Sequence, residues 1–348
     1  MEEGITDPRE AWIKIIESQE SIANRFYEIN RIDPRGGDGS FSLVFTAVDR
    51  MRRKPKRICL KFLDPLAGNE YRRQCFHREA DILKDLVGQR NILPLVQEKS
   101  RFDLVLSGIT FPLYYYGSHL GRFNVKHYIY NEENNFLTNI LFFREMCKAI
   151  QRIHSKRICH RDLRPDNFLV FNKRYVCLSD FGTARYFGEK SITLLDSYLG
   201  PVGDMRYTAP ELLCGLHFSD YHNYCADIYS LGANLYELFT KSELASVIYK
   251  NDELLEFITH FSLVPEKNRV EVFDGFIDAF SEERNLFPVR MHNEFIPKAI
   301  AYEVDRLYQS MACLNYKKRE KDFQRIFLRI NICEKVIRTH KSRRGEIC

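Results

Sequence analysis

The sequence predicts an α+β protein in which a β-rich part precedes an α-helical part. Short β-rich runs follow one another from Tyr27 to Leu63, whereas the chain becomes mainly helical after about Gly117. The clearest helix is Phe136–Ser155, where apolar side chains recur at helical spacing. The 348 residues show no internal repeat, and 45% apolar and 13% aromatic side chains are globular composition. We therefore expect two lobes with a cleft between them.

Charge and cysteine usage exclude several classes of protein. The 52 Lys and Arg residues against 47 Asp and Glu leave a net charge of +5, too even to identify a nucleic-acid binder. Ten cysteines without a C-x-x-C pair argue against zinc ribbons and favour reduced thiols in a cytoplasmic protein. No secretory signal is readable, and no apolar run approaches the ~20 residues that span a bilayer. We expect no transmembrane segment.

Residues 1–26 are expected to form an amphipathic helix. Asp7 and Pro8 are typical of an N-cap and first helical position, and apolar residues recur from Trp12 through Ile22 to Phe26. Packing on the following domain is the simplest role for this helix. A homodimer contact is the alternative.

Residues 27–116 are expected to form the β-rich lobe with one main helix, at 69–86. The basic stretch 50–57 lies between two strands, so a solvated hairpin tip is favoured over a phosphate- or lipid-binding patch. The expected strands are Tyr27–Ile32, Leu43–Val48, Arg57–Leu63, Ile92–Val96, Phe102–Leu106 and Ile109–Tyr116.

Residues 117–340 are expected to form the helical lobe, which closes with a helix around Phe323–Ile337 and leaves a basic tail at 341–348. Segment 241–300 is longer than a minimal lobe needs and carries 7 basic and 11 acidic side chains. It is either a solvated elaboration or an acidic docking surface for a basic protein.

A glycine-rich segment, Gly36–Val44, lies between two expected strands and reads GGDGSFSLV. Its backbone N–H groups can wrap phosphates without side-chain obstruction, although a plain hairpin has the same composition. Lys61 follows in an apolar strand, where an ammonium ion is costly to bury without an anion. Cys59 lies on the same face, and Glu79 on the next helix is a credible partner.

Two acidic motifs follow the strong helix. The segment His160–Asn167 reads HRDLRPDN, and a carboxylate, a cation and an amide at this spacing can converge on a phosphoryl centre. Asp180 opens the run DFG, 18 residues after Asp162 and at the end of an expected strand. A carboxylate there can bind a metal that bridges phosphate oxygens.

Together these motifs resemble a eukaryotic-type (Hanks-type) protein kinase, with a catalytic loop of the serine/threonine kind, over about residues 27–335. The run DIYSLG at Asp227–Gly232 is similar to the family's D-x-W-S-x-G segment. The matching positions are Gly37, Gly39, Ser42, Val44, Lys61, Glu79, the two acidic motifs, Ala209-Pro210-Glu211 and Arg319.

The resemblance implies ATP as phosphoryl donor and Mg²⁺ as metal, with Mn²⁺ as an alternative. Asp162 would accept the proton of the substrate hydroxyl, and Arg164 takes the place of a usual lysine. Lys61, paired with Glu79, would hold the α- and β-phosphates. Asn167 and Asp180 would bind the metal. Further nucleotide contacts would come from Gly37, Gly39, Ser40, Val44, Cys59 and Leu169.

One departure concerns the substrate platform, which by the resemblance comprises Asp204, Thr208, Glu211 and Arg319. Asp204 stands where the family usually has threonine. Beside the lysine-to-arginine exchange at Arg164, it suggests a guanidinium–carboxylate pair. Asp204 would also lie near Asp162, and a like charge raises a carboxyl pKa.

The resemblance favours transfer of phosphate to serine or threonine of a protein substrate, with autophosphorylation. A pseudokinase scaffold is the alternative, but Lys61, Asp162 and Asp180 are all retained. A small-molecule kinase is a further alternative, disfavoured because Ala209-Pro210-Glu211 with Arg319 is a peptide-substrate platform.

Regulation by phosphorylation of the loop between Asp180 and Glu211 is also implied. A loop phosphate would dock on Arg161, with Arg185 as a second cation. Cys75 stands where the family's third basic contact is expected, so the pocket would be incomplete. The acceptor candidates are Ser191, Thr193, Ser197 and Tyr198.

Overall fold

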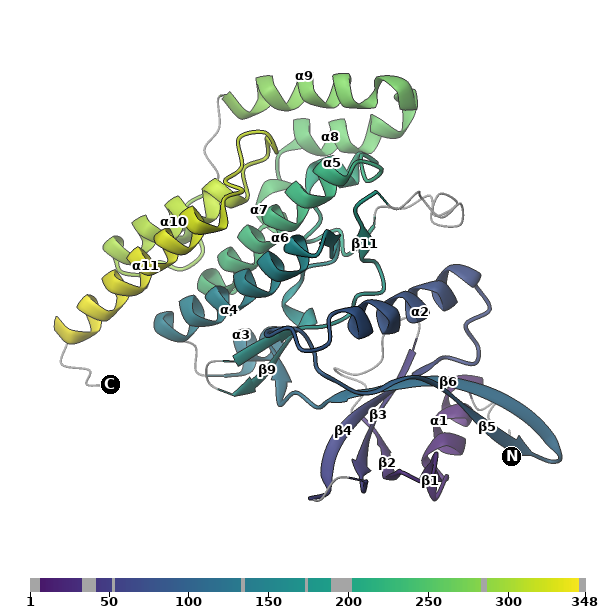
Figure 1. Cartoon of the computed structure of the whole chain (residues 1–348). Coiled ribbons are helices and arrows are strands. Elements are labelled where there is room, and N and C mark those ends of the chain that lie inside the picture. The colour runs from purple at the N-terminus through teal and green to yellow at the C-terminus, as the bar shows by residue number, and fades with distance from the viewer. Residues whose placement is uncertain are drawn as a thin grey trace, which may run out of the picture. The chain divides into compact units, whose positions relative to one another are not determined.

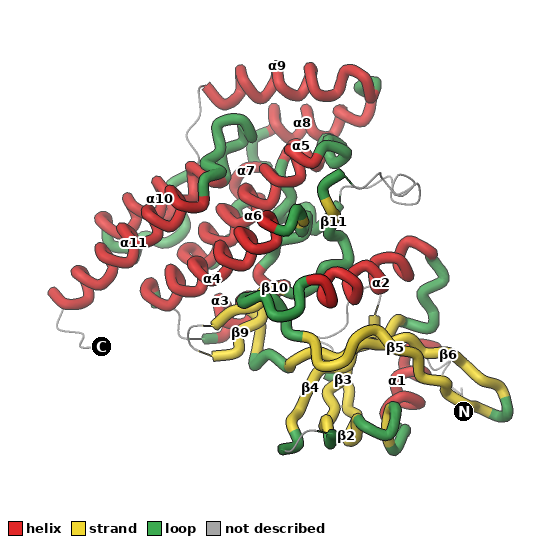
Figure 2. Tube along the Cα trace, viewed as in Figure 1, coloured by secondary structure: helices red, strands yellow, loops and turns green. Residues whose placement is uncertain are grey.

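The computed structural model describes residues 7–32, 42–51, 54–132, 135–172, 175–188, 202–282 and 287–343. The chain divides into two compact units (Figure 1). The N-terminal unit comprises Met1–Gly121 with Asp180–Gly182, and the C-terminal unit comprises the remaining residues. Strands dominate the first unit and helices dominate the second (Figure 2), which confirms the expected α+β class.

The N-terminal unit is built on a six-stranded antiparallel sheet with strand order β1-β2-β3-β4-β6-β5. Its inward side chains are aliphatic or aromatic, and they form one apolar core. The strands are β1 (Ser21–Ile22), β2 (Phe26–Arg31), β3 (Ser42–Asp49), β4 (Lys56–Leu63), β5 (Leu95–Leu106) and β6 (Ile109–His119).

One strand, β5, contains the expected strand Phe102–Leu106 and the last two residues of the expected strand Ile92–Val96. The polar stretch 97–100 lies between these two apolar runs in the sequence. In the structure, β5 pairs with β6 through this stretch, with register shifts between Leu95 and Gln97 and between Gln97 and Ser100. The β5–β6 pairing therefore continues through the polar residues with local irregularities in register.

Helix α1 (Pro8–Glu17) begins as predicted but is shorter than the expected 1–26 segment. The side chain of Asp7 caps it by accepting a hydrogen bond from the backbone N–H of Arg9 (3.0 Å). Ile22 and Phe26 are buried on β1 and β2 instead. Ala23 and Asn24 between them adopt positive φ, a conformation incompatible with a continuing α-helix.

Helix α1 packs on the sheet. Ile13 and Ile16 belong to the same apolar core as the inward residues of the strands. The ring of Trp12 meets Phe111 of β6 edge to face, with centroids 5.5 Å apart. Helix α2 (Glu70–Asp85), capped by Asn69, is the expected main helix and packs against β5.

Helix α6 (Asp220–Thr240) is the buried centre of the C-terminal unit, contacted by α4 (Phe136–Ser155) and α10 (Lys298–Met311). Helix α4 has the predicted bounds, and α11 (Phe323–Arg343) lies alongside α10, as Figure 1 shows. A side chain at Gly232 of α6 would place its Cβ 2.8 Å from the backbone nitrogen of Ala312. Close approach of α6 to this backbone therefore requires glycine.

Short elements carry the segments that the motifs occupy. Strand β9 pairs with β7 and β10, and β8 pairs with β11. Their bounds are β7 (Phe123–Asn124), α3 (Val125–Asn131), β8 (Ile158–Cys159), η1 (Pro165–Asn167), β9 (Phe168–Asn172), β10 (Tyr175–Leu178), β11 (Arg185–Tyr186) and α5 (Pro210–Leu213).

Segment 241–300 is mainly helical in its described parts. It contains α7 (Ala245–Ile248), α8 (Asp252–His260), α9 (Arg269–Glu282) and the single turns η2 (Phe261–Leu263), η3 (Glu266–Asn268) and η4 (Val289–Met291). Some of its acidic side chains bind other residues of the same chain. Asp274 accepts a hydrogen bond from the Tyr316 hydroxyl (2.7 Å) and pairs with Lys317 (2.9 Å).

Across the described ranges, no helix combines the length and the apolar character needed to cross a membrane. Each cysteine there, from Cys59 to Cys333, is a free thiol.

Candidate active site

Lys61 projects from β4 toward two carboxylates of the N-terminal unit. Its Nζ lies 2.7 Å from Oε2 of Glu79 on α2 and 3.7 Å from Oδ1 of Asp180. Burial by itself lowers the pKa of Lys61, but the charges of Glu79 and Asp180 outweigh it and raise that pKa. Lys61 is therefore held as a cation, and the expected pairing with Glu79 is confirmed.

Tyr116 is a member of this group that sequence reasoning missed. It lies opposite Lys61 in the β4–β6 ladder, and its hydroxyl forms a hydrogen bond with Glu79. Burial, followed by the charge of Glu79, raises the pKa of Tyr116 well above its ordinary value. The hydroxyl therefore stays protonated and donates to the carboxylate. The antiparallel register that brings Tyr116 to this place is set by strands far apart in sequence.

The other expected nucleotide residues of this unit divide into two groups. Val44 is the register partner of Lys61 in the β3–β4 ladder, and Cys59 faces Ser118 across β4 and β6. Burial raises the pKa of the Cys59 thiol to about 11, so this thiol is a neutral, weakly reactive group at pH 7. Gly37, Gly39 and Ser40 lie outside the described residues.

In the C-terminal unit, Asp227 on α6 anchors the segment His160–Asn167. Its fully buried carboxylate accepts the backbone N–H groups of His160 and Arg161, each at 2.8 Å. The carboxylate also lies 2.9 Å from Nε2 of His154 on α4. Because Arg161 has a φ of 67°, a strained conformation for this residue type, these bonds hold the chain in a turn it would otherwise avoid.

His154, Cys159 and Asp227 bring three potential metal-ligand atoms within 4.8 Å of one another. Because the carboxylate of Asp227 already accepts two backbone hydrogen bonds, we assign this group to anchoring the segment. His160 has a similar structural task. Its Nδ1 accepts the backbone N–H of Asp162 (3.3 Å), which leaves Nε2 to donate to the carbonyl oxygen of Ser179 (3.0 Å).

The carboxylate of Asp162 is oriented from two sides. Its Oδ1 accepts the backbone N–H of Asp204 (2.9 Å), and its Oδ2 lies 3.3 Å from Nδ2 of Asn167. The same Nδ2 donates to the backbone oxygen of Asp162 (2.8 Å). The amide of Asn167 therefore uses its nitrogen on Asp162, which fixes the side-chain oxygen as its remaining ligand atom.

Arg164 lies beside this carboxylate and pairs as expected with Asp204. Its Nη1 donates to Oδ2 of Asp204 (2.9 Å), and its Nε donates to Oδ2 of Asp166 (3.0 Å). A second cation, Arg206, was missed by sequence reasoning. Its guanidinium donates to both oxygens of Asp204, at 3.0 and 2.6 Å.

The expectation that a like charge raises the pKa of Asp204 is wrong. Burial acts in that direction, but hydrogen bonds from Arg206 and the charges of Arg206 and Arg164 outweigh it and lower the pKa. Two guanidinium groups on one carboxylate keep Asp204 ionised. The residue therefore serves as an anion that binds cations.

Gly203 fits the close packing of this segment. It has a φ of 88°, and a Cβ there would collide with the backbone oxygen of Arg161. The glycine therefore lets residues 203–204 lie against the segment that carries Asp162.

The remaining platform residues form a rigid base. Glu211 and Arg319 make a two-bond ion pair, with one contact at 2.9 Å, and both side chains have no exposed surface. Arg319 also donates to backbone oxygens of Cys313, Cys225 and Leu314. Thr208 is buried and donates its hydroxyl to the backbone oxygen of Asp204 (2.8 Å). The expected pair of Glu211 with Arg319 is confirmed.

The expected regulatory cations already have partners within the chain. Nε of Arg161 donates to the backbone oxygen of Thr183 (2.7 Å), and Nη1 of Arg185 donates to that of His217 (3.2 Å). Cys75 is buried against Gly182. The four acceptor candidates, Ser191, Thr193, Ser197 and Tyr198, lie outside the described residues.

The structure supplies oxygen donors of the kind that Mg²⁺ prefers. The Asp180 carboxylate is 45% exposed, and Asn167 offers its amide oxygen. Leu169 lies on β9, directly after this asparagine and its neighbour, and is partly exposed. Each unit therefore offers one oxygen ligand with the chemistry that the implied metal requires.

A sheet-based unit with a paired lysine and a helical unit with an anchored aspartate define the class of protein kinases. The sequence model of the family described as protein kinase domain matches residues 32–324. The chain belongs to this family.

Curated relatives agree. The chain is 29% identical over 242 residues to the serine/threonine-protein kinase PknD of Chlamydia abortus, covering 62% of this chain and 24% of that protein. It is 32% identical over 227 residues to the probable serine/threonine-protein kinase glkA of Dictyostelium discoideum, covering 63% and 41%. The matched region thus spans about a quarter of the PknD relative and less than half of glkA.

Proposed function

We propose that this chain is an ATP-dependent protein kinase that transfers the γ-phosphoryl group to serine or threonine hydroxyls of a protein substrate. The observation that carries the proposal is the setting of Asp162. Its carboxylate is fixed by Asn167 and by the N–H of Asp204, with the cation of Arg164 beside it. A positioned carboxylate next to a positioned cation suits proton removal from a hydroxyl during phosphoryl transfer.

The side chains have separate tasks. Asp162 accepts the hydroxyl proton, and Arg164 offsets the negative charge of the transferring group. Lys61, kept cationic by Glu79, holds nucleotide phosphates, since a buried ammonium with an anion on one side can bind a second anion on the other. Asn167 and Asp180 would hold Mg²⁺, which when bound neutralises charge on the phosphate oxygens.

Serine and threonine are the proposed acceptors for two reasons. The catalytic segment reads LRPDN after Asp162, which resembles the serine/threonine pattern. The relatives above carry serine/threonine-protein kinase in their names. Autophosphorylation belongs to the same proposal, because the chain has hydroxyl side chains in the segment between Asp180 and Glu211.

The test is incubation of the purified chain with Mg-ATP and a mixture of generic protein substrates, followed by mass-spectrometric site mapping. Asp162→Asn is the control for contaminating kinases. Phosphoserine and phosphothreonine that depend on Asp162 support the proposal. Phosphotyrosine alone would overturn the acceptor assignment, and equal labelling with Asp162→Asn would overturn the activity.

A further inference from the structure

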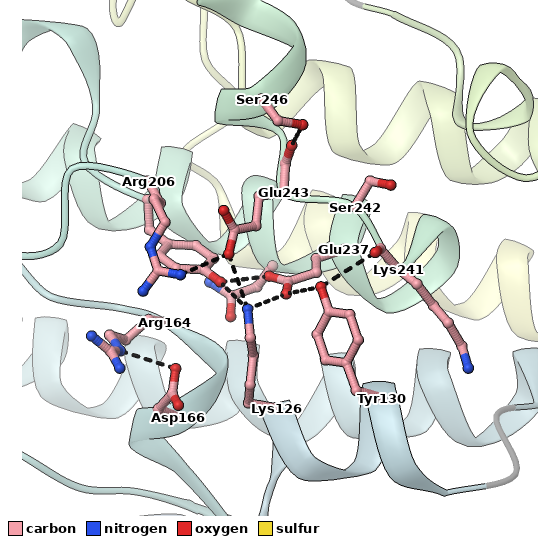
Figure 3. A network of polar contacts seen from close by, with 12 residues as sticks. Lys126, Tyr130, Arg164, Asp166, Arg206, Glu237, Lys241, Ser242, Glu243 and Ser246 are labelled. Atoms are coloured by element: carbon pink, nitrogen blue, oxygen red, sulfur yellow. Dashed lines mark hydrogen bonds and ion pairs between the residues drawn. The ribbon is translucent and has the colours of Figure 1, made fainter. Parts of the chain in front are cut away.

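A fully buried carboxylate lies close to the substrate platform within the C-terminal unit. Glu237 of α6 has no exposed surface, and three donors reach it (Figure 3). Lys126 Nζ lies 2.7 Å from Oε1, the Tyr130 hydroxyl 2.9 Å from Oε1, and the Tyr207 hydroxyl 2.7 Å from Oε2. Within the described part of the chain, Lys126 is the cation paired with Glu237.

The ammonium group of Lys126 is surrounded by groups that stabilise a positive charge. Its Nζ also contacts Glu243 (3.1 Å), and it lies over the rings of Tyr130 and Tyr207, 4.9 and 5.8 Å from their centroids. Two carboxylates and two aromatic faces together form a cage for an ammonium ion. We call Lys126, Tyr130, Tyr207, Glu237 and Glu243 the ammonium cage.

The cage is connected to the proposed catalytic aspartate. Glu243 accepts a hydrogen bond from Arg206 (2.8 Å), and Arg206 binds Asp204 (2.6 Å). The backbone N–H of Asp204 in turn donates to Asp162. Tyr207 belongs to the cage and to the platform segment at once. An unbroken series of polar contacts therefore runs from Lys126 to Asp162, all within one unit. Figure 3 shows its first part, from Lys126 through Glu243 to Arg206.

The tyrosines alone cannot satisfy Glu237. Burial, followed by the charge of Glu237, raises the pKa of both Tyr130 and Tyr207, so each remains a neutral donor. Two neutral hydrogen bonds leave a negative charge in a site with no exposed surface. Removing one member of a buried ion pair leaves the other charge uncompensated, which is strongly destabilising.

We propose that Lys126 is the built-in counter-ion of Glu237 and a positioning residue that holds Tyr207 and Arg206 in place for the protein substrate. This inference rests on the proposed function. It predicts that loss of the lysine disturbs residues 204–207 and weakens use of the protein substrate. Use of ATP should be unaffected, because Lys61, Glu79 and Asp180 belong to the other unit. Asn167 and Leu169 share the unit of Lys126, but none of the contacts described above joins them directly to the ammonium cage.

The experiment compares Lys126→Ala, Lys126→Met, Glu237→Gln and the double variant Lys126→Met/Glu237→Gln. For Lys126→Ala we expect the KM for protein substrate to rise by about tenfold, with the KM for ATP unchanged. The reason is that the buried carboxylate of Glu237 loses its paired cation. Methylammonium or ethylammonium in the buffer should restore much of the loss by entering the emptied cage. The double variant should recover relative to Lys126→Met, because it has neither charge.

The matched control is Lys148→Ala on α4, which removes a partly exposed lysine that pairs with Glu145 (2.6 Å). Its KM should equal that of the unaltered chain and should not respond to amines. A Lys126→Ala variant with unchanged KM for protein substrate would overturn the proposal. So would a loss that neither amines nor Glu237→Gln relieves.

Melting temperatures test the counter-ion role of Lys126 independently of any kinase activity. Lys126→Met should melt below the unaltered chain, and Glu237→Gln in the same chain should restore the melting temperature. Amines should raise the melting temperature of Lys126→Ala. These results are expected even if the unaltered chain transfers no phosphate, which would refute the proposed function alone. Additive losses of melting temperature in the double variant would refute the counter-ion role.

Discussion

Asp204 shows how one residue changes the tasks of its neighbours. Its carboxylate binds Arg164 and Arg206, while its backbone N–H orients Asp162. A threonine at this position could not pair with two guanidinium groups. The arginine in the catalytic segment and the aspartate on the platform are therefore complementary, since a planar guanidinium matches a carboxylate better than an ammonium does.

Arg164→Ala and Asp204→Ala should consequently be strongly non-additive in kcat/KM. The double variant should lose about as much as Asp204→Ala alone, because Arg164 has already lost one partner there. Asp204→Ala should be the more damaging single change, since it also releases Arg206. The measurement is a double-mutant cycle on peptide phosphorylation, with Arg206→Ala as the third arm. A double loss equal to the sum of the two single losses would show that the side chains act separately.

Contacts between residues of recognisable motifs could be predicted from the sequence. Lys61 with Glu79, Arg164 with Asp204, and Glu211 with Arg319 are all found as expected. Partners outside the motifs could not be predicted. Strand register brings Tyr116 to Glu79, 37 positions away in the sequence, within the N-terminal unit. Helix packing brings Lys126 to Glu237, 111 positions away, within the C-terminal unit. Neither carries a local sequence signal.

At the level of elements, α1 contacts both strands that flank the glycine-rich segment. Glu10 pairs with Arg31 at the end of β2 (2.7 Å), and Glu17 accepts the backbone N–H of the same arginine (2.7 Å). Arg9 donates to the backbone oxygen of Ser42 at the start of β3 (3.2 Å) and pairs with Asp64 (3.0 Å). The helix thereby fixes the strand ends from which the segment departs.

If that segment binds phosphate, the double variant Arg9→Ala/Glu10→Ala should raise the KM for ATP by about threefold to tenfold, because each partly exposed pair contributes up to ~1 kcal/mol. The KM for protein substrate should stay constant. Lys14→Ala, on an exposed position of the same helix, is the matched control. Steady-state kinetics at varied ATP would decide. An unaltered KM for ATP in the double variant would show that α1 only covers the apolar core.

The periodicity of apolar residues predicted which segments are helices and which are strands. It did not predict the end of α1 or the extent of β5. Helix α4 and strands β2, β3 and β4 have the expected places. The end of α1 was misplaced because Ile22 and Phe26 continue its apolar spacing by chance, while Ala23 and Asn24 turn the chain. Strand β5 was divided because a polar stretch within a strand is indistinguishable, in sequence, from a loop between two strands.

At the level of the whole molecule, the candidate residues are distributed over two compact units. Lys61, Glu79 and Asp180 belong to one unit, and Asp162 and Asn167 to the other. Each unit has its own stabilising centre. In the C-terminal unit that centre is α6, which supplies Asp227, Glu237 and the buried His222. Stability of this unit and geometry of the catalytic segment therefore depend on the same helix.

His222 makes the fold sensitive to acid. It is 6% exposed, and neither ring nitrogen has a hydrogen-bond partner in the described residues. Burial lowers the pKa of His222 below its ordinary value of 6.5, because the charged form would lose its hydration. As the pH falls below 6.5, the unfolded chain therefore takes up a proton that the folded chain resists, and stability declines.

His222→Phe should consequently lose less melting temperature between pH 7.5 and pH 5.5 than the unaltered chain does. The ring of Tyr316, with its centroid 4.7 Å away, can pack against phenylalanine as it does against the imidazole. Thermal melts at both pH values provide the comparison. Equal falls in melting temperature would mean that His222 does not contribute to acid sensitivity.

The central claim is that Asp162 is the base of an ATP-dependent phosphoryl transfer. It is tested most directly by measuring Mg-ATP binding and single-turnover phosphoryl transfer on the unaltered chain and on Asp162→Asn. We predict that both bind Mg-ATP within about threefold of each other, while transfer falls by at least ~10³ in Asp162→Asn, because the nucleotide groups remain and the base is lost. Equal transfer by both proteins would contradict the role of Asp162. Binding without transfer by the unaltered chain would instead identify an ATP-binding scaffold.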